Sequence, residues 1–147
     1  MDTSVNLKLL GKNQEDLKII SAYLQDSILI VKDIVFLKHN RTFIMIVNRF
    51  MWEDVEKGVI RQNKRIRCAV KFEEVIKVES KNINQKNKNK PLECLAIKYS
   101  SIFDETYKIK IFFAGNSIIT IISEVIEVAL HDIGKPWNVK HIPIHKI

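Results

Sequence analysis

One uninterrupted apolar run, Phe43 to Val47, constrains the fold of this 147-residue chain more than any other stretch. Five consecutive apolar residues need cover on both faces, so the run predicts a strand inside a sheet rather than at its edge. The run ends abruptly in the hexapeptide NRFMWE, residues 48–53. An amide, a guanidinium, two aromatic rings and a carboxylate therefore follow one another where the strand leaves the core.

Composition indicates one soluble globular domain over residues 1–147. Apolar residues make up 46% and charged residues 28%, and a chain of this length can bury a core without metal ions or disulfides. The two cysteines, Cys68 and Cys94, have no ligand spacing around them, which predicts reduced core thiols in a cytoplasmic protein. No secretory signal is visible, and the most hydrophobic stretch, residues 117–130, is too short to span a membrane.

The net charge of +7 raises the question of a nucleic-acid partner. Only 5 of the 24 basic residues are Arg, and the chain also holds 24 Ile and 11 Asn. Such a joint excess of Lys, Ile and Asn is what an AT-rich genome encodes whatever a protein binds. Phosphate-reading surfaces more often use Arg for its fork geometry. We therefore discount the charge as an argument for nucleic-acid binding.

The N-terminal half predicts one helix and several strands. Asn13 and the acidic residues after it are a helix N-terminus signal, and Leu17, Ile20, Leu24 and Ile28 follow at helical spacing, which predicts a helix over residues 14–26. Short antiparallel strands then follow, with tight turns between them. The predicted strands before the middle of the chain are 5–10, 28–31, 34–37 and 43–47.

The C-terminal half predicts further strands and one ambiguous segment. Strand character returns over 65–78, with an interruption at Glu74 interpreted as a bulge, and over 92–99, 107–114 and 117–122. Residues 81–91 are rich in Lys and Asn and predict a mobile loop. Residues 123–133 fit either a C-terminal helix stopped by Gly134 and Pro136 or a continued strand, and the Gly-then-Pro stop favours the helix.

These elements predict an α+β fold. A mostly antiparallel sheet would curl into a barrel or sandwich, with the 14–26 helix packed on it.

No catalytic, cofactor or metal-binding motif can be assembled from the sequence. The 4 glycines are too scattered for a phosphate loop or a dinucleotide fingerprint. His141 and His145 are separated by Pro143, which prevents the helix that would place both on one face. An enzyme using Cys68 or the neighbouring His131 and Asp132 stays a minor hypothesis.

The candidate binding residues gather around the hexapeptide. They are Asn48, Arg49, Trp52, Glu53, Asp26 and Trp137. In one interpretation the aromatic rings are core and Arg49 pairs with a carboxylate such as Asp26 or Glu53. In the other, Arg49 and Trp52 carry a binding surface, because Arg and aromatic residues contribute most to interface energies.

Several segments together resemble a family of uncharacterised single-domain bacterial proteins that occur chiefly among alphaproteobacteria. The segments are residues 24–26, residues 33–37, the NRF-x-WE motif of residues 48–53, and residues 132–137. The resemblance covers residues 7–137 and implies a cytoplasmic bacterial protein. It brings no activity, cofactor or site residues. The lysine-rich tract 81–90 departs from the family pattern by its length.

We therefore expect a small non-enzymatic binding or adaptor domain that acts on a protein partner or associates with itself. The alternative is a protein that binds RNA or a phosphate-bearing surface. It would use Arg61, Lys64, Arg65, Arg67 and the lysines of residues 81–90.

Overall fold

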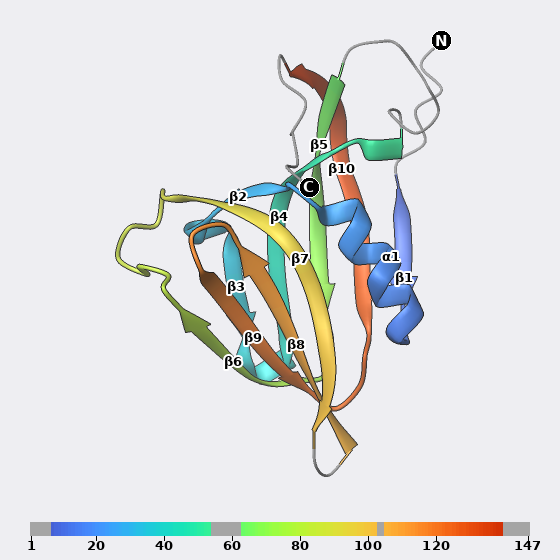
Figure 1. Cartoon of the computed structure of the whole chain (residues 1–147), viewed down its shortest axis with the longest axis vertical. Helices are drawn as coiled ribbons and strands as arrows, with labels where there is room; N and C mark the ends of the chain where they lie inside the picture. The colour runs from blue at the N-terminus through green and yellow to red at the C-terminus, as the bar shows by residue number, and fades with distance from the viewer. Residues whose placement is uncertain (1–6, 54–62, 103–104, 140–147) are drawn as a thin grey trace.

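A computed structural model describes residues 7–53, 63–102 and 105–139 (Figure 1). The elements are β1 (Lys8–Gly11), α1 (Gln14–Leu24), β2 (Ile28–Ile30), β3 (Ile34–Leu37), β4 (Thr42–Phe50), β5 (Asn63–Phe72), β6 (Val75–Lys81), β7 (Pro91–Ile102), β8 (Thr106–Phe113), β9 (Ser117–Ser123) and β10 (Val128–Val139). Two short 3-10 turns, Val31–Asp33 and Lys38–Asn40, flank β3.

The strands form one curled antiparallel sheet that folds into two layers, which confirms the predicted α+β class and the mostly antiparallel sheet. Strand order is β1-β10-β5-β4-β2-β7-β8-β9-β6, with β3 on β4. The three-residue β2 pairs with both β4 and β7, so it joins a back layer (β1, β10, β5, β4, β3) to a front layer (β7, β8, β9, β6) (Figure 1).

The sheet does not close into a barrel. Within the described residues β3 pairs with β4 and β6 pairs with β9, and the edges of β3 and β6 are not paired with each other. A cavity of about 410 Å³ lies at this opening, lined by residues of β3 and β6 among others. The architecture is a sandwich with one open side.

The apolar run lies on β4 in the middle of the back layer, as predicted. β4 pairs with β5 along one edge and with β2 and β3 along the other. Phe43, Met45 and Val47 are buried on the inner face, whereas Ile44 and Ile46 on the outer face are only half-buried. Cover was expected on both faces of this strand, but only its inner face is fully buried.

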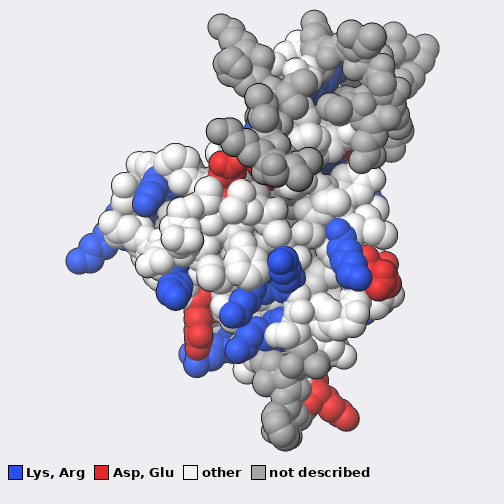
Figure 2. All heavy atoms as spheres, viewed as in Figure 1, with Lys and Arg blue, Asp and Glu red and all other residues white. Residues whose placement is uncertain are grey.

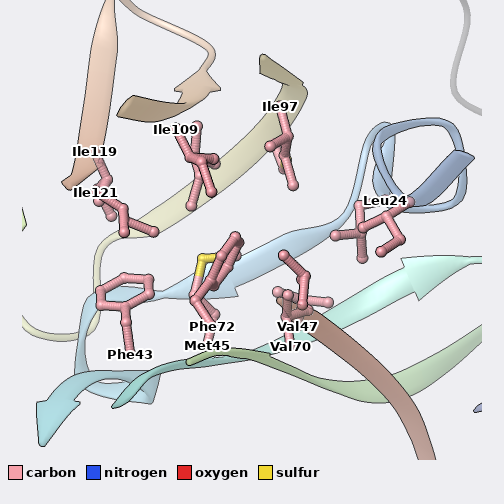
Figure 3. Close-up of a cluster of buried hydrophobic side chains, with 14 of the residues drawn as sticks. Leu24, Phe43, Met45, Val47, Val70, Phe72, Ile97, Ile109, Ile119 and Ile121 are labelled. Atoms are coloured by element: carbon pink, nitrogen blue, oxygen red, sulfur yellow. The ribbon is translucent and has the colours of Figure 1, made fainter. Parts of the chain in front are cut away.

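The inner faces of the two layers meet in one hydrophobic core. Figure 3 shows Phe43, Met45 and Phe72 of the back layer opposite Ile109 and Ile121 of the front layer. All five side chains are at most 1% exposed, and burial of this kind stabilises a fold by about 1.5–3 kcal/mol per large apolar side chain.

The predicted N-terminal helix is confirmed as α1. The side chain of Asn13 accepts a hydrogen bond from the Asp16 amide at 2.8 Å, which caps the first turn. Leu17, Ile20 and Leu24 are buried in the core. The helix ends two residues earlier than predicted, because Asp26 has a positive φ of 65° and its amide donates to the Cys94 carbonyl.

The predicted C-terminal helix over residues 123–133 is wrong. The segment turns after Ser123 and continues as β10, which pairs with β1 on one edge and β5 on the other. Val128, Leu130 and Asp132 alternate as buried residues, so the period of 2 and the β-branched content outweigh the stop signal. Gly134, with φ +76°, lies where the register with β5 shifts, so it forms a bulge instead of ending a helix.

The interruption at Glu74 is also not a bulge within one strand. Its φ of 54° belongs to a turn that carries the chain from β5 in the back layer to β6 in the front layer. The residues between β6 and β7 make their own turns, for example between the Asn87 amide and the Asn84 carbonyl. The mobility expected of that loop stays a prediction.

Candidate functional site

Arg49 lies at the centre of a buried ion cluster. Its Nε and Nη2 donate to both carboxylate oxygens of Asp132 at 2.8 and 2.7 Å, and its Nη1 and Nη2 donate to both oxygens of Glu53 at 2.9 and 2.8 Å. The Arg49 side chain has no exposed surface. Its guanidinium is therefore clamped by two carboxylates, one from its own strand end and one from β10.

Electrostatics and packing both hold this guanidinium in its charged form. Burial acts to lower the pKa of Arg49, but the hydrogen bonds that it donates to Asp132 and Glu53, together with their charges, outweigh burial and raise that pKa above the ordinary value. The guanidinium also lies 5.7 Å from the ring centre of Tyr23, which belongs to α1. One side chain thus links β4, β10 and α1.

The expected pairing of Arg49 with Glu53 is confirmed, and Asp132 is a second partner that the sequence did not indicate as one. Asp132 also accepts from the Leu7 amide at 2.9 Å, so it holds β1 and β10 at the same point. Because Arg49 is fully buried, its guanidinium does not form part of an exposed surface. The physical reason is strand parity: Arg49 shares the inner face with Phe43, Met45 and Val47.

Trp52 is half-buried and has a structural contact of its own. Its indole Nε1 donates to the Gln25 carbonyl at 2.8 Å, and its ring stands edge-on to Phe50 at 4.6 Å between ring centres. Trp52 and Glu53 have helical conformation directly after β4. The indole N–H therefore provides a hydrogen bond to the carbonyl of Gln25, the residue that follows α1.

Asp26 and Asn48 are brought together through Arg65. Arg65 Nη1 donates to both of their carbonyl oxygens at 3.0 Å, and its guanidinium lies 5.7 Å from the Phe50 ring centre. Asp26 is buried, with 2% exposure. Trp137, which is 39% exposed, pairs in register with Arg65 on β10. All six candidate residues thus lie near one end of the back layer, and their role in binding stays a prediction.

The basic residues of the RNA-binding alternative receive no support from their contacts. Arg65 is engaged with backbone carbonyls, and burial lowers its pKa. Arg67 lies 3.6 Å from Asp33. Arg61 lies outside the described residues.

The residues of the minor enzymatic hypothesis are not arranged for catalysis. Burial raises the pKa of Cys68 and of Cys94 to about 12, so both stay as unreactive thiols near neutral pH. His131 and Asp132 point to opposite faces of β10, the first exposed and the second buried against Arg49. Among the described residues no group of three or more His, Cys, Asp or Glu side chains could hold a metal ion.

An apolar patch on the outer face of the back layer was not singled out from the sequence. We call it the back face. It consists of Leu10, Val35, Ile44, Ile46, Ala69 and Ala129. In register, Val35 is opposite Ile44 and Ile46 is opposite Ala69, whereas Leu10 and Ala129 lie beyond Lys71. The sequence signal for this patch was the apolar run itself, because its alternate residues Ile44 and Ile46 face outward.

Two of the cations next to the back face, Lys71 and Arg67, have acidic neighbours. Lys71 lies in register between Ile44 and Ala129, and its ammonium is 3.0 Å from Glu73. Arg67 faces Asp33 in the same way. The charge of these cations is therefore largely balanced within the chain itself.

The described part of the chain contains no helix with the length and apolar character needed to cross a membrane. A family model described as "Protein of unknown function (DUF2948)" matches residues 7–145. Searches among curated proteins and among solved structures give no match.

Proposed function

Because this chain belongs to the DUF2948 family of proteins of unknown function, we propose a role from its geometry: a non-enzymatic binding domain that self-associates through the back face. The observation that carries this is the apolar outer side of the central strand. Ile44 and Ile46 lie side by side with Val35 and Ala69 in a sheet face that is otherwise solvent-facing. Apolar patches exposed on a surface commonly mark protein interfaces.

A second copy of the chain fits this patch better than a charged partner does. A two-fold axis would place the patch against itself, as two sheets stack about 10 Å apart. The neighbouring cations Lys71 and Arg67 lie beside Glu73 and Asp33, so two copies would not strongly repel one another there. An acidic partner would gain little from cations that are already balanced.

The ion cluster has a supporting role in this proposal. Arg49 and Asp132 tie β4 to β10, and both strands contribute residues to the back face. Candidate residues that are buried, such as Arg49 and Asp26, would act by fixing the strands in place rather than by touching the partner.

Sedimentation equilibrium tests self-association directly. We expect a dimer with a dissociation constant of about 1–10 µM, which corresponds to roughly −7 to −8 kcal/mol. Val35→Lys should leave a monomer at about 100 µM protein, because each copy would bury a new charge in the interface. Ile76→Lys is the matched control: Ile76 on β6 has the same 44% exposure as Val35 but lies in the front layer.

Two outcomes would contradict self-association. One is a wild-type protein that stays monomeric at about 100 µM, a concentration that would detect dissociation constants well into the micromolar range. The other is a monomer that captures a different protein through the back face and loses it in Val35→Lys. Equal effects of Val35→Lys and Ile76→Lys would likewise remove the back face from the explanation.

We also propose that the protein works in the cytoplasm of a bacterium. Two free thiols, Cys68 and Cys94, and the family resemblance of the NRF-x-WE motif support this location. Fractionation of cells that carry the native protein, with blotting of cytoplasmic and periplasmic fractions, tests it. A mainly periplasmic protein would contradict the assignment.

A further inference from the structure

The outer face of the front layer carries a grid of lysines that the sequence separates but the sheet brings together. In register, Lys108 lies between Ser100 and Ile122, and Lys110 lies between Lys98 and Thr120. On β6, Lys77 continues the row of Lys108 through Ile122, and Lys81 lies in the next-but-one row, opposite Ile118. We call these five residues the lysine face. They are Lys77, Lys81, Lys98, Lys108 and Lys110.

The lysine face contains a like-charge pair that works against folding. Lys98 and Lys110 are directly opposite each other in an antiparallel pair, an arrangement that destabilises a sheet when both residues carry the same charge. Lys108 lies two positions before Lys110, on the same side of β8. A bound layer of anions would remove this repulsion.

Acidic residues offset the charge only in part. Among the described outward positions of these rows, Glu79 is the one acid, and its carboxylate lies 2.9 Å from the Lys77 ammonium. Figure 2 shows basic side chains gathered over the front strands. The face therefore stays strongly positive.

We propose that the lysine face docks the protein on the surface of an anionic phospholipid bilayer. Three strands of the front layer, β6, β7 and β8, carry the lysines on one extended surface, so several can reach lipid phosphates together. Each lysine held near an anionic leaflet raises the partition coefficient about fivefold. Lysine ammoniums suit this delocalised attraction, which does not need the fork geometry of Arg.

The same face fits single-stranded nucleic acid less well. Binding of this kind relies on open aromatic rings on which bases stack. Phe112, the outward aromatic residue of these rows, is half-buried, and the Lys98 ammonium lies 5.8 Å from its ring centre. A base could therefore stack on Phe112 only if Lys98 moved away from the ring.

Vesicle co-sedimentation tests the proposal with the full-length protein. Binding is expected to vesicles of 70% phosphatidylcholine and 30% phosphatidylglycerol, roughly the anionic content that gives a strongly negative surface, and not to pure phosphatidylcholine. Lys108→Glu with Lys110→Glu should weaken binding by at least about 25-fold. Raising salt from about 0.1 to 1 M, which shortens the screening length from about 10 to 3 Å, should also release the protein.

A charge-matched control separates the lysine face from net charge. Lys86→Glu with Lys88→Glu changes the charge equally but lies in the loop between β6 and β7. This control should keep most of the binding. Folding is checked in parallel, and the Lys108→Glu, Lys110→Glu variant should melt no lower than wild type, because Glu at position 110 would face Lys98.

Three results would overturn the proposal. The first is equal binding to neutral and anionic vesicles. The second is an equal loss in the loop control, which would make the attraction a matter of net charge. The third is tight, salt-sensitive binding to a single-stranded oligonucleotide by a protein that ignores anionic vesicles, which would assign the face to nucleic acid instead.

Discussion

Replacing Arg49 by Met should destabilise the protein severely. The substitution keeps the length of the side chain but removes the charge from a site with no exposed surface. Asp132 and Glu53 then lose the four hydrogen bonds that Arg49 donates to them. Removing one partner of a buried ion pair typically costs about 3–5 kcal/mol, because an uncompensated charge stays behind.

The matched control is Arg67→Met on the neighbouring strand. Arg67 also faces one carboxylate, Asp33, but at 3.6 Å and with its side chain 47% exposed. Exposed pairs of this kind contribute at most about 1 kcal/mol. The two Arg→Met variants therefore differ mainly in burial and in the number of carboxylates that lose a partner.

Thermal unfolding followed by circular dichroism measures the difference. Arg49→Met should lower the melting temperature by roughly 6–20 °C, at about 2–4 °C per kcal/mol for a chain of this size. The double variant Arg49→Met, Asp132→Asn should lose less stability than the sum of the losses of the two single variants, because the two residues interact directly. A loss for Arg49→Met no larger than that for Arg67→Met would refute the view that the cluster stabilises the back layer.

Two further predictions concern Trp52 and the thiols. Trp52→Ala should cost about 2–4 kcal/mol in urea unfolding, because it removes the hydrogen bond to Gln25 and the contact with Phe50; an unchanged midpoint would return Trp52 to a purely binding role. Stability should fall above about pH 9, by up to about 1.4 kcal/mol per pH unit for each thiol, because unfolded cysteines ionise there while the folded pKa values of Cys68 and Cys94 are about 12; a double Ala variant with an equally steep decline would contradict this.

The sequence predicts the elements of this fold well because most of its patterns are local. The cap at Asn13 and the alternation in β8 depend on neighbours along the chain, and both predictions are confirmed. The segment after Ser123 was mistaken because a Gly-then-Pro stop is also compatible with a bulge at Gly134 in a strand paired on both edges. Pairing with β1 and β5, which are distant along the chain, makes the segment a strand.

The ion cluster was only partly predictable. The parity of Phe43, Met45 and Val47 extends to Arg49, so alternation alone points its side chain inward. Glu53, four residues away, is a partner that the sequence can suggest. Asp132 is 83 residues from Arg49, and only the register of β10 on β5 brings it within reach.

The lysine face was hidden for a different reason. Lys108 and Lys110 stand out as the polar side of β8, but Lys77 and Lys98 have no local pattern that joins them to that strand. The sheet order β7-β8-β9-β6 makes them neighbours. Composition accounts for the net charge of the chain as a whole. It does not show that folding gathers part of that charge on one side of the front layer.

The back face and the lysine face lie on opposite sides of the same two layers, with the shared core between them. A dimer through the back face would therefore turn its two lysine faces away from each other. One flat bilayer could engage only one of them, so dimerisation would add no avidity on a single membrane. Conversely, charge reversal at Lys108 and Lys110 would leave the dimer contact untouched. The two surfaces do not compete, and loss of either one leaves the other open to measurement.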